Sequence, residues 1–214
     1  MFVDRIEAGQ ELGKSLVNYR GKDVVVVAIP RGGVLVAKEV AIKLEAPLEL
    51  VIPRKIGAPG NPELAIGAMA DKDTVIINEH LRGSLRVLDD YLKAEVEKQA
   101  QEIERRRKRY LGAKSQIDLE NKIIILVDDG LATGYTALAA IKALRRRKPK
   151  KLILAVPVAP KDTIERLGRE VDELICLHSP EIFFAVGQFY SNFSQTTDDE
   201  VIQVLKEYEA KEKG

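Results

Sequence analysis

The chain has 214 residues, of which 34 are basic and 33 acidic, so its formal net charge is only +1. This balance disfavours general binding to nucleic acid or to a membrane surface, which calls for a basic excess. Cys176 is the single cysteine, which rules out an internal disulfide and favours a cytoplasmic setting. We expect no signal peptide and no membrane span, since no apolar run is long enough. The length fits one domain, residues 1–214.

Hydrophobic patterning in the first quarter of the chain predicts a βαβ unit that follows an amphipathic helix over residues 4–19. The run VVVVAI at 24–29 predicts a buried strand. Apolar residues at roughly helical spacing follow over 34–44, and a second short apolar strand is expected over 48–52. Two strands joined by a helix within about 30 residues are parallel.

The middle of the chain has a different composition. Residues 55–70, KIGAPGNPELAIGAMA, are rich in Gly and Pro, which predicts no long regular element there. Two short strands of a hairpin are expected over 65–70 and 74–78. A long polar helix with a thin apolar stripe is expected over 84–110.

Alternation of strands and helices then returns. Strands are expected over 122–127, 152–156 and 173–177, and helices over 136–147, 161–169 and 197–209. The last helix begins at a capping box formed by Thr197 and Glu200. The whole pattern predicts an α/β fold, a Rossmann-like and mostly parallel sheet flanked by helices.

The most informative segment is IIILVDDGLATGYT at 123–136. A buried strand ends in two acids, Asp128 and Asp129, which can bind two neighbouring hydroxyls of a sugar. The loop and helix start that follow can hold a phosphate through backbone N–H groups. Neither GxxxxGK[ST] nor GxGxxG is present, and the spacing of phosphatases with an aspartyl nucleophile is not met.

This segment resembles the phosphoribosyl-diphosphate motif of type I phosphoribosyltransferases, in which a strand and two acids precede T-G-x-T. The resemblance implies that Asp128 and Asp129 bind the ribose 2′- and 3′-hydroxyls. It also implies that the 5-phosphate lies on the loop that follows. The loop residues are Gly130, Ala132, Thr133, Gly134, Tyr135 and Thr136.

Two further segments fit the same ligand. PRGG at 30–33 follows the first strand, where the resembling family has its diphosphate loop; Arg31 offers charge, and Gly32 and Gly33 leave N–H groups bare for an anion. By the same resemblance we expect a cis peptide bond at Arg31–Gly32. Arg54 and Lys55 follow the second strand, where that family often has a basic residue for the diphosphate, so these two are expected to act with Arg31.

Aromatic residues gather near the end of the chain, in SPEIFFAVGQFY at 179–190. The segment is similar to the tail of hypoxanthine-type phosphoribosyltransferases. That similarity implies that Phe184 stacks on a base and that the backbone near Val186 bonds the base edge. We therefore expect residues 178–198 to form a hood over the site and residues 57–110 to form an inserted lid.

The resemblance implies transfer of a 5-phosphoribosyl group from phosphoribosyl diphosphate to a nitrogenous base, with release of diphosphate. Asp128, Asp129, Arg31 and Lys55 are the expected catalytic residues. Mg²⁺ is expected to be held mainly by the substrate, with no dedicated protein metal site. The alternative is a regulator that binds phosphoribosyl diphosphate without chemistry. The acceptor stays open, and the resemblance also allows a homodimer.

Overall fold

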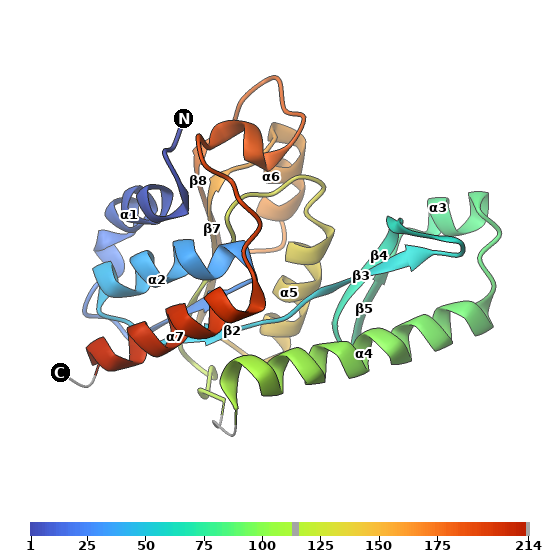
Figure 1. The fold of residues 1–214 in the computed structure, drawn as a ribbon, viewed down its shortest axis with the longest axis horizontal. Helices are drawn as coiled ribbons and strands as arrows, with labels where there is room; N and C mark the ends of the chain where they lie inside the picture. The colour runs from blue at the N-terminus through green and yellow to red at the C-terminus, as the bar shows by residue number, and fades with distance from the viewer. Residues whose placement is uncertain (113–115, 213–214) are drawn as a thin grey trace.

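The computed structural model describes residues 1–112 and 116–212. Its centre is a parallel five-stranded sheet in the order β2-β1-β6-β7-β8 (Figure 1). The strands are β1 (Val24–Ala28), β2 (Leu48–Leu50), β6 (Ile123–Val127), β7 (Lys151–Val158) and β8 (Glu173–His178). The flanking helices are α1 (Arg5–Ser15), α2 (Gly32–Leu44), α5 (Tyr135–Arg146), α6 (Lys161–Gly168) and α7 (Asp198–Glu212). The predicted α/β fold is confirmed.

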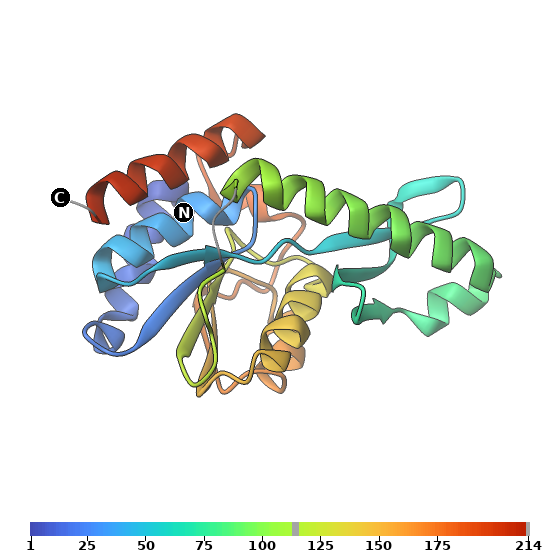
Figure 2. The ribbon, with the colours of Figure 1, turned by 90° about the horizontal axis from the view of Figure 1, so that it is seen from below.

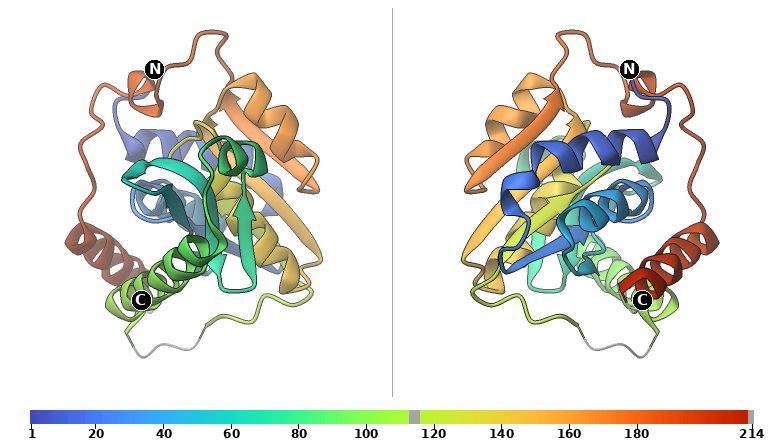
Figure 3. Two further views of the ribbon diagram at one scale, coloured as in Figure 1. Left: turned by 90° about the vertical axis from the view of Figure 1, so that its right-hand side faces the viewer. Right: turned by 90° about the vertical axis from the view of Figure 1, so that its left-hand side faces the viewer.

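Each central strand is apolar throughout because both faces of the sheet are covered. All five residues of β1 are buried. Val24 and Val26 pack in the cluster that contains α1, α2 and α7. Val25 and Val27 point to the opposite face and pack against α5 and α6. The helices therefore form one layer on each side of the sheet (Figure 3).

A second unit leaves the core after β2 and returns before β6. It contains an antiparallel sheet in the order β3-β4-β5 and two helices, and it projects from one side of the core (Figures 1 and 2). We call residues 54–111 the inserted unit; its elements are β3 (Arg54–Ala58), β4 (Asn61–Asp71), β5 (Thr74–Ile77), α3 (Glu79–Ser84) and α4 (Asp89–Leu111). Ile56, Ile66 and Met69 pack against α4 in a small core of its own.

The structure corrects two expectations in this unit. Residues 55–70 are not irregular, since β4 alone is 11 residues long. Gly67 of β4 suits close approach of the strands, because a β-carbon there would lie 2.3 Å from the carbonyl oxygen of Ile76. The long polar helix expected over 84–110 is present as α4, but it begins five residues later than predicted. α3 ends at Ser84, and α4 begins after Leu88, whose side chain is 74% exposed instead of contributing to an apolar stripe.

The segment between β8 and α7 crosses the carboxyl edge of the sheet and contains one short 3₁₀ helix, η2 (Val186–Phe189). It is tied to the start of the chain, where Phe2 donates to the Phe189 carbonyl over 2.8 Å and accepts from Ser191 over 2.8 Å. The Thr197–Glu200 capping box forms and starts α7. Within the described residues, no helix is both long enough and apolar enough to cross a bilayer.

Candidate active site

The predicted diphosphate loop and the two acids meet at the carboxyl edge of the sheet. β1 and β6 are adjacent and parallel, so the residues that follow them emerge side by side. A β-carbon built on Gly32 would lie 1.9 Å from Oδ2 of Asp129. One built on Gly33 would lie 2.9 Å from Oδ1 of Asp128. The two glycines are thus required by the close approach of the PRGG loop to the acids.

The cis peptide bond lies one residue earlier than expected. It joins Pro30 to Arg31, whereas the resemblance implied Arg31–Gly32. Gly32 is the first residue of α2 and Arg31 is its N-cap, so the Arg31–Gly32 bond already leads into regular helix, where peptide bonds are trans.

The two adjacent carboxylates differ in environment. Asp128 accepts a hydrogen bond at Oδ1 from the backbone N–H of Asp129 over 2.8 Å. Burial, and then the charge of Asp129, raise the pKa of Asp128 well above its ordinary value. A cation or a sugar hydroxyl beside Asp128 would stabilise the ionised form of this carboxyl group.

Arg5 is the site residue that the sequence did not reveal. Its Nε lies 2.7 Å from Oδ2 of Asp129, and its side chain is only 9% exposed. The N-cap Asp4 starts α1 by accepting from Ile6 and Glu7, which fixes Arg5 in the first turn. A single arginine at the start of an amphipathic helix belongs to no motif, so only the tertiary structure shows its role.

Arg5 also connects the acids to the predicted hood. Its Nη1 donates to the carbonyl oxygen of Ser194 over 2.9 Å, and its guanidinium lies 3.8 Å from the centre of the Phe193 ring. From the same segment, Tyr190 donates its hydroxyl proton to the carbonyl oxygen of Asp129. The predicted hood is therefore attached directly to the two-acid strand end.

The loop after the acids has the backbone of a phosphate-binding turn. Gly130 and Gly134 have φ values of 155° and 68°, conformations that favour glycine. Gly134 is the N-cap of α5, whose first N–H groups have no intrahelical acceptor. The loop is supported from α6, because Thr163 donates to the Ala132 carbonyl over 2.7 Å and Arg166 donates to that of Thr133. Thr136 lies in the first turn of α5.

Tyr135 connects this loop to the inserted unit. Its hydroxyl accepts a hydrogen bond from Nδ2 of Asn78 over 2.9 Å. Asn78 is the N-cap of α3, so the phosphate-type loop and the inserted unit share a polar contact. The aromatic ring also lies under the guanidinium of Arg166, with 5.3 Å between the charge centre and the ring centre.

The structure separates the two basic residues that were expected to act together. Arg54 and Lys55 are neighbours in β3, and neighbouring strand residues point to opposite faces. Arg54 is partly buried and donates from Nε to Oε1 of Gln99 on α4 over 3.0 Å. The side chain of Lys55 is exposed. Burial, and then the nearby charge of Arg106, lower the pKa of Arg54.

The two hood residues also differ in position. Val186 packs against the site, because a β-carbon on Gly130 would lie 2.5 Å from its Cγ1. Phe184 is 86% exposed and faces solvent. The backbone N–H of Phe184 donates to Oε1 of Gln188 over 2.9 Å. The same oxygen accepts a second hydrogen bond from the N–H of Ala185. An exposed ring on a braced turn is free to contact a flat ligand.

The donor set of the site suits a cation held through a ligand. In the part of the chain that the structure describes, no three His, Cys, Asp or Glu side chains gather where they could hold a metal together. Asp128 and Asp129 supply hard carboxylate oxygens, which Mg²⁺ prefers, but two carboxylates leave most of its coordination to substrate and water.

The parallel sheet, with the two acids and the glycine-bearing loop at its carboxyl edge, has the arrangement that the resemblance to type I phosphoribosyltransferases implied. The family model for the phosphoribosyl transferase domain matches residues 5–194. The chain therefore belongs to the phosphoribosyl transferase domain family.

Relatives from two organisms are similar over nearly the whole chain. Proteins of Mycobacterium tuberculosis strains CDC 1551 and H37Rv, provisionally named phosphoribosyl transferases, are 43% identical over 205 residues. The match covers 96% of this chain and 46% of each relative, so the chain spans about half their length. The crystal structure of TT1426 from Thermus thermophilus superposes with a TM-score of 0.80 at 37% identity, covering 97% of this chain and 98% of that one.

Proposed function

We propose that this protein transfers a 5-phosphoribosyl group from phosphoribosyl diphosphate to a nitrogenous base and releases diphosphate. The observation that carries the proposal is the direct packing of the PRGG loop on the two acids, with Gly32 against Asp129 and Gly33 against Asp128. A loop for the diphosphate and acids for the ribose hydroxyls must lie this close, because the diphosphate is attached to the carbon next to the 2′-hydroxyl. Membership of the family supports the same reading.

The roles of the residues follow from their positions. Asp128 and Asp129 bind the 2′- and 3′-hydroxyls, and the loop from Gly130 to Thr136 binds the 5-phosphate at the start of α5. Arg31, Gly32 and Gly33 bind the diphosphate with Arg54. Lys55 lies on the opposite face of β3 from Arg54, so its expected role stays a prediction and is not part of this diphosphate site.

The chemistry demands charge stabilisation more than covalent work. The sugar ring gains positive charge as the glycosidic bond to diphosphate breaks, and the carboxylates stand beside it. Mg²⁺, bound mainly to substrate oxygens with Asp128 and Asp129 nearby, would neutralise charge on the leaving diphosphate. The inserted unit, including residues 57–110, acts as a lid that excludes water.

The acceptor is placed beneath the hood, residues 178–198. Phe184 provides a stacking surface, and the backbone near Val186 bonds the edge of the base. The closeness of Val186 to Gly130 supports an acceptor site next to the sugar. The proposed acceptor is a nucleobase-like molecule, and the proposed reaction involves neither a nucleic acid nor a membrane.

Incubation with Mg²⁺, phosphoribosyl diphosphate and a panel of nucleobases tests the proposal. Diphosphate release that depends on one of the bases is the expected result. Tight donor binding without turnover for any base would contradict transfer and favour a regulator that binds the donor. Release of diphosphate at the same rate with and without base would indicate hydrolysis instead.

A further inference from the structure

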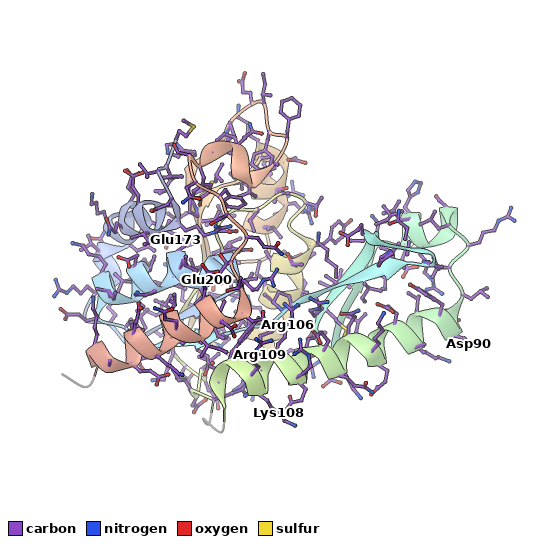
Figure 4. The ribbon with its side chains drawn as sticks, viewed as in Figure 1. Asp90, Arg106, Lys108, Arg109, Glu173 and Glu200 are labelled. Atoms are coloured by element: carbon purple, nitrogen blue, oxygen red, sulfur yellow. The ribbon has the colours of Figure 1, made fainter. Side chains whose placement is uncertain are left out.

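A group of arginines lies where the inserted unit meets the core. Arg31 comes from the PRGG loop, Arg54 from β3, and Arg106 and Arg109 from α4. Figure 4 shows Arg106 and Arg109 on the part of α4 that runs below the start of α7. There Arg109 pairs with Asp198 over 3.0 Å, and this ion pair joins the two helices.

The spacing of residues on α4 places Arg106 between Arg54 and Arg31. Gln99, Arg106 and Tyr110 are separated by seven and four residues, so they lie on one face of the helix. Gln99 holds Arg54 over 3.0 Å at one end of this row. At the other end, Tyr110 donates to Asp198 over 2.6 Å, and Asp198 lies 3.7 Å from Arg31. The pKa of Arg54 is lowered by burial and then by Arg106, with Arg31 contributing as well.

Arg31, Arg54 and Arg106 have guanidinium donors that no nearby carboxylate of the described residues satisfies. Arg31 is separated from Asp198 by 3.7 Å, which is an ion pair but too long for a hydrogen bond. Arg54 has an amide as its hydrogen-bond partner and pairs with no carboxylate among the described residues. Arg106 bonds Glu102 through Nε, and within residues 1–112 and 116–212 its Nη atoms make no hydrogen bond.

Glu102 does not neutralise Arg106 alone. Arg105 binds the same carboxylate through two nitrogens, at 2.7 and 2.9 Å, and this holds the pKa of Glu102 down at about 2. One negative charge is therefore shared by two guanidinium groups. Unused donors on several partly buried cations are the features of a site for an anion with many oxygens.

We infer that Arg106 and Arg54 of the inserted unit, together with Arg31, form a binding site for the diphosphate group of the donor. The inference rests on the proposed function and adds to it a residue, Arg106, from outside every sequence motif. A diphosphate carries several negative charges and enough oxygens to receive forked N–H donors from two sides. The same site would receive free inorganic diphosphate after transfer.

The two parts of the site come from different units, so the ligand would join them. Arg31 belongs to the core, and Arg54 and Arg106 belong to the inserted unit. An anion between them would draw the inserted unit onto the core. Such an anion would add to the Arg109–Asp198 ion pair, which already joins α4 of the inserted unit to α7 of the core.

Titration calorimetry with inorganic diphosphate in magnesium buffer tests the inference. Arg106→Gln should weaken binding about tenfold, the loss expected for one charge-assisted contact. Arg105→Gln is the matched control, since Arg105 is adjacent, shares Glu102, and has a side chain that is 54% exposed. It should bind diphosphate as the unchanged protein does. Ribose 5-phosphate, which lacks the diphosphate, should bind both variants equally.

Equal diphosphate affinity in Arg106→Gln and the unchanged protein would overturn the inference, as would equal weakening in both variants. Arg106→Lys retains the positive charge opposite Glu102 but loses the planar guanidinium group. Its affinity for diphosphate should lie between those of Arg106→Gln and the unchanged protein, and this variant tests the inference even if Arg106→Gln folds poorly. If Arg31→Gln loses diphosphate binding while Arg106→Gln keeps the affinity of the unchanged protein, only the inference about Arg106 is rejected. Failure of the unchanged protein to bind phosphoribosyl diphosphate would reject the proposed function itself.

Discussion

The Nε of Arg5 lies 2.7 Å from Oδ2 of Asp129, although 124 residues separate them in the chain. The pair is mostly shielded from water, with side-chain exposures of 9% and 16%. Arg5 therefore supplies the positive charge beside two adjacent carboxylates. Binding of the donor would bring further positive charge, as Mg²⁺, to the same acids.

Removal of this guanidinium should destabilise the protein. Arg5→Met leaves Asp129 without its buried partner, and we expect the free energy of unfolding to fall by about 3 kcal/mol. Urea denaturation measures the difference. Arg20→Met is the control, because the ion pair of Arg20 with Glu45 is at least half exposed at both side chains and should change stability by less than about 1 kcal/mol. A similar small change in Arg5→Met would contradict the role of Arg5.

Asp128→Asn should stabilise the unliganded protein and weaken donor binding. The folded pKa of Asp128 is raised, so in the window above its unfolded value of about 3.9 the folded state binds more protons than the unfolded state. The contribution of Asp128 to the free energy of unfolding is fully present below the unfolded pKa. It is lost as the pH rises through the higher pKa of the folded state. Asparagine carries no such charge, so the melting temperature at pH 7 should rise.

Comparison of melting at pH 7 and pH 4 checks the sign for Asp128. The advantage of the asparagine variant should shrink at the lower pH, where the native carboxyl is closer to protonated. Calorimetry with phosphoribosyl diphosphate should meanwhile show binding at least about tenfold weaker, because a hydroxyl would lose a charged acceptor. A variant that melts lower than the native protein at pH 7 would refute the electrostatic account.

Gly32→Ala should abolish donor binding because the added methyl group cannot fit. Its β-carbon would lie 1.9 Å from Oδ2 of Asp129 and 2.7 Å from Nε of Arg5, so the loop, the acid and the arginine must all shift. Gly83→Ala provides the control, since a β-carbon there meets no atom within 4 Å. Calorimetry with phosphoribosyl diphosphate distinguishes the two variants. Native affinity in Gly32→Ala would show that the contact is unimportant to the ligand.

Phe184→Ala should affect the acceptor but not the donor. Loss of a stacking surface should raise the KM for the active base about tenfold and leave the affinity for phosphoribosyl diphosphate unchanged. Ile182→Ala is a matched control, because Ile182 is also apolar and 68% exposed in the same segment. Steady-state kinetics with the base varied at saturating donor gives the answer; equal KM values in both variants would remove Phe184 from the acceptor site.

The parallel core could be predicted because local sequence determines it. β1 and β6 are runs of β-branched and aliphatic residues, β7 and β8 have such a run at their centre, and all four were predicted within a few residues. The loops after β1 and β6 contain glycines, and from the sequence alone these glycines indicate that the backbone approaches a ligand closely. Their mutual contact followed from the rule that parallel strands end at one edge.

The rest depended on contacts that no local pattern encodes. Arg5 and Arg106 are ordinary residues of amphipathic helices, and only packing brings them to the site. In the inserted unit, β3 and the first part of β4 were missed because Gly57, Gly60 and the nearby prolines imply irregular backbone, whereas Gly57 lets the two strands approach closely. Lys55 and Arg54 were grouped because they are adjacent, although a strand sends neighbours to opposite faces.

The attachment of the hood to the first residues of the chain has a consequence for folding. Phe2 pairs with Tyr190, and Arg5 bonds Ser194 across 189 positions of sequence. Contacts this distant in sequence form slowly, because a long loop must close before they add stability. The core sheet can form from nearer neighbours, so the hood should be the last part to assemble. During synthesis, Arg5 can make this contact only after Ser194 has been added.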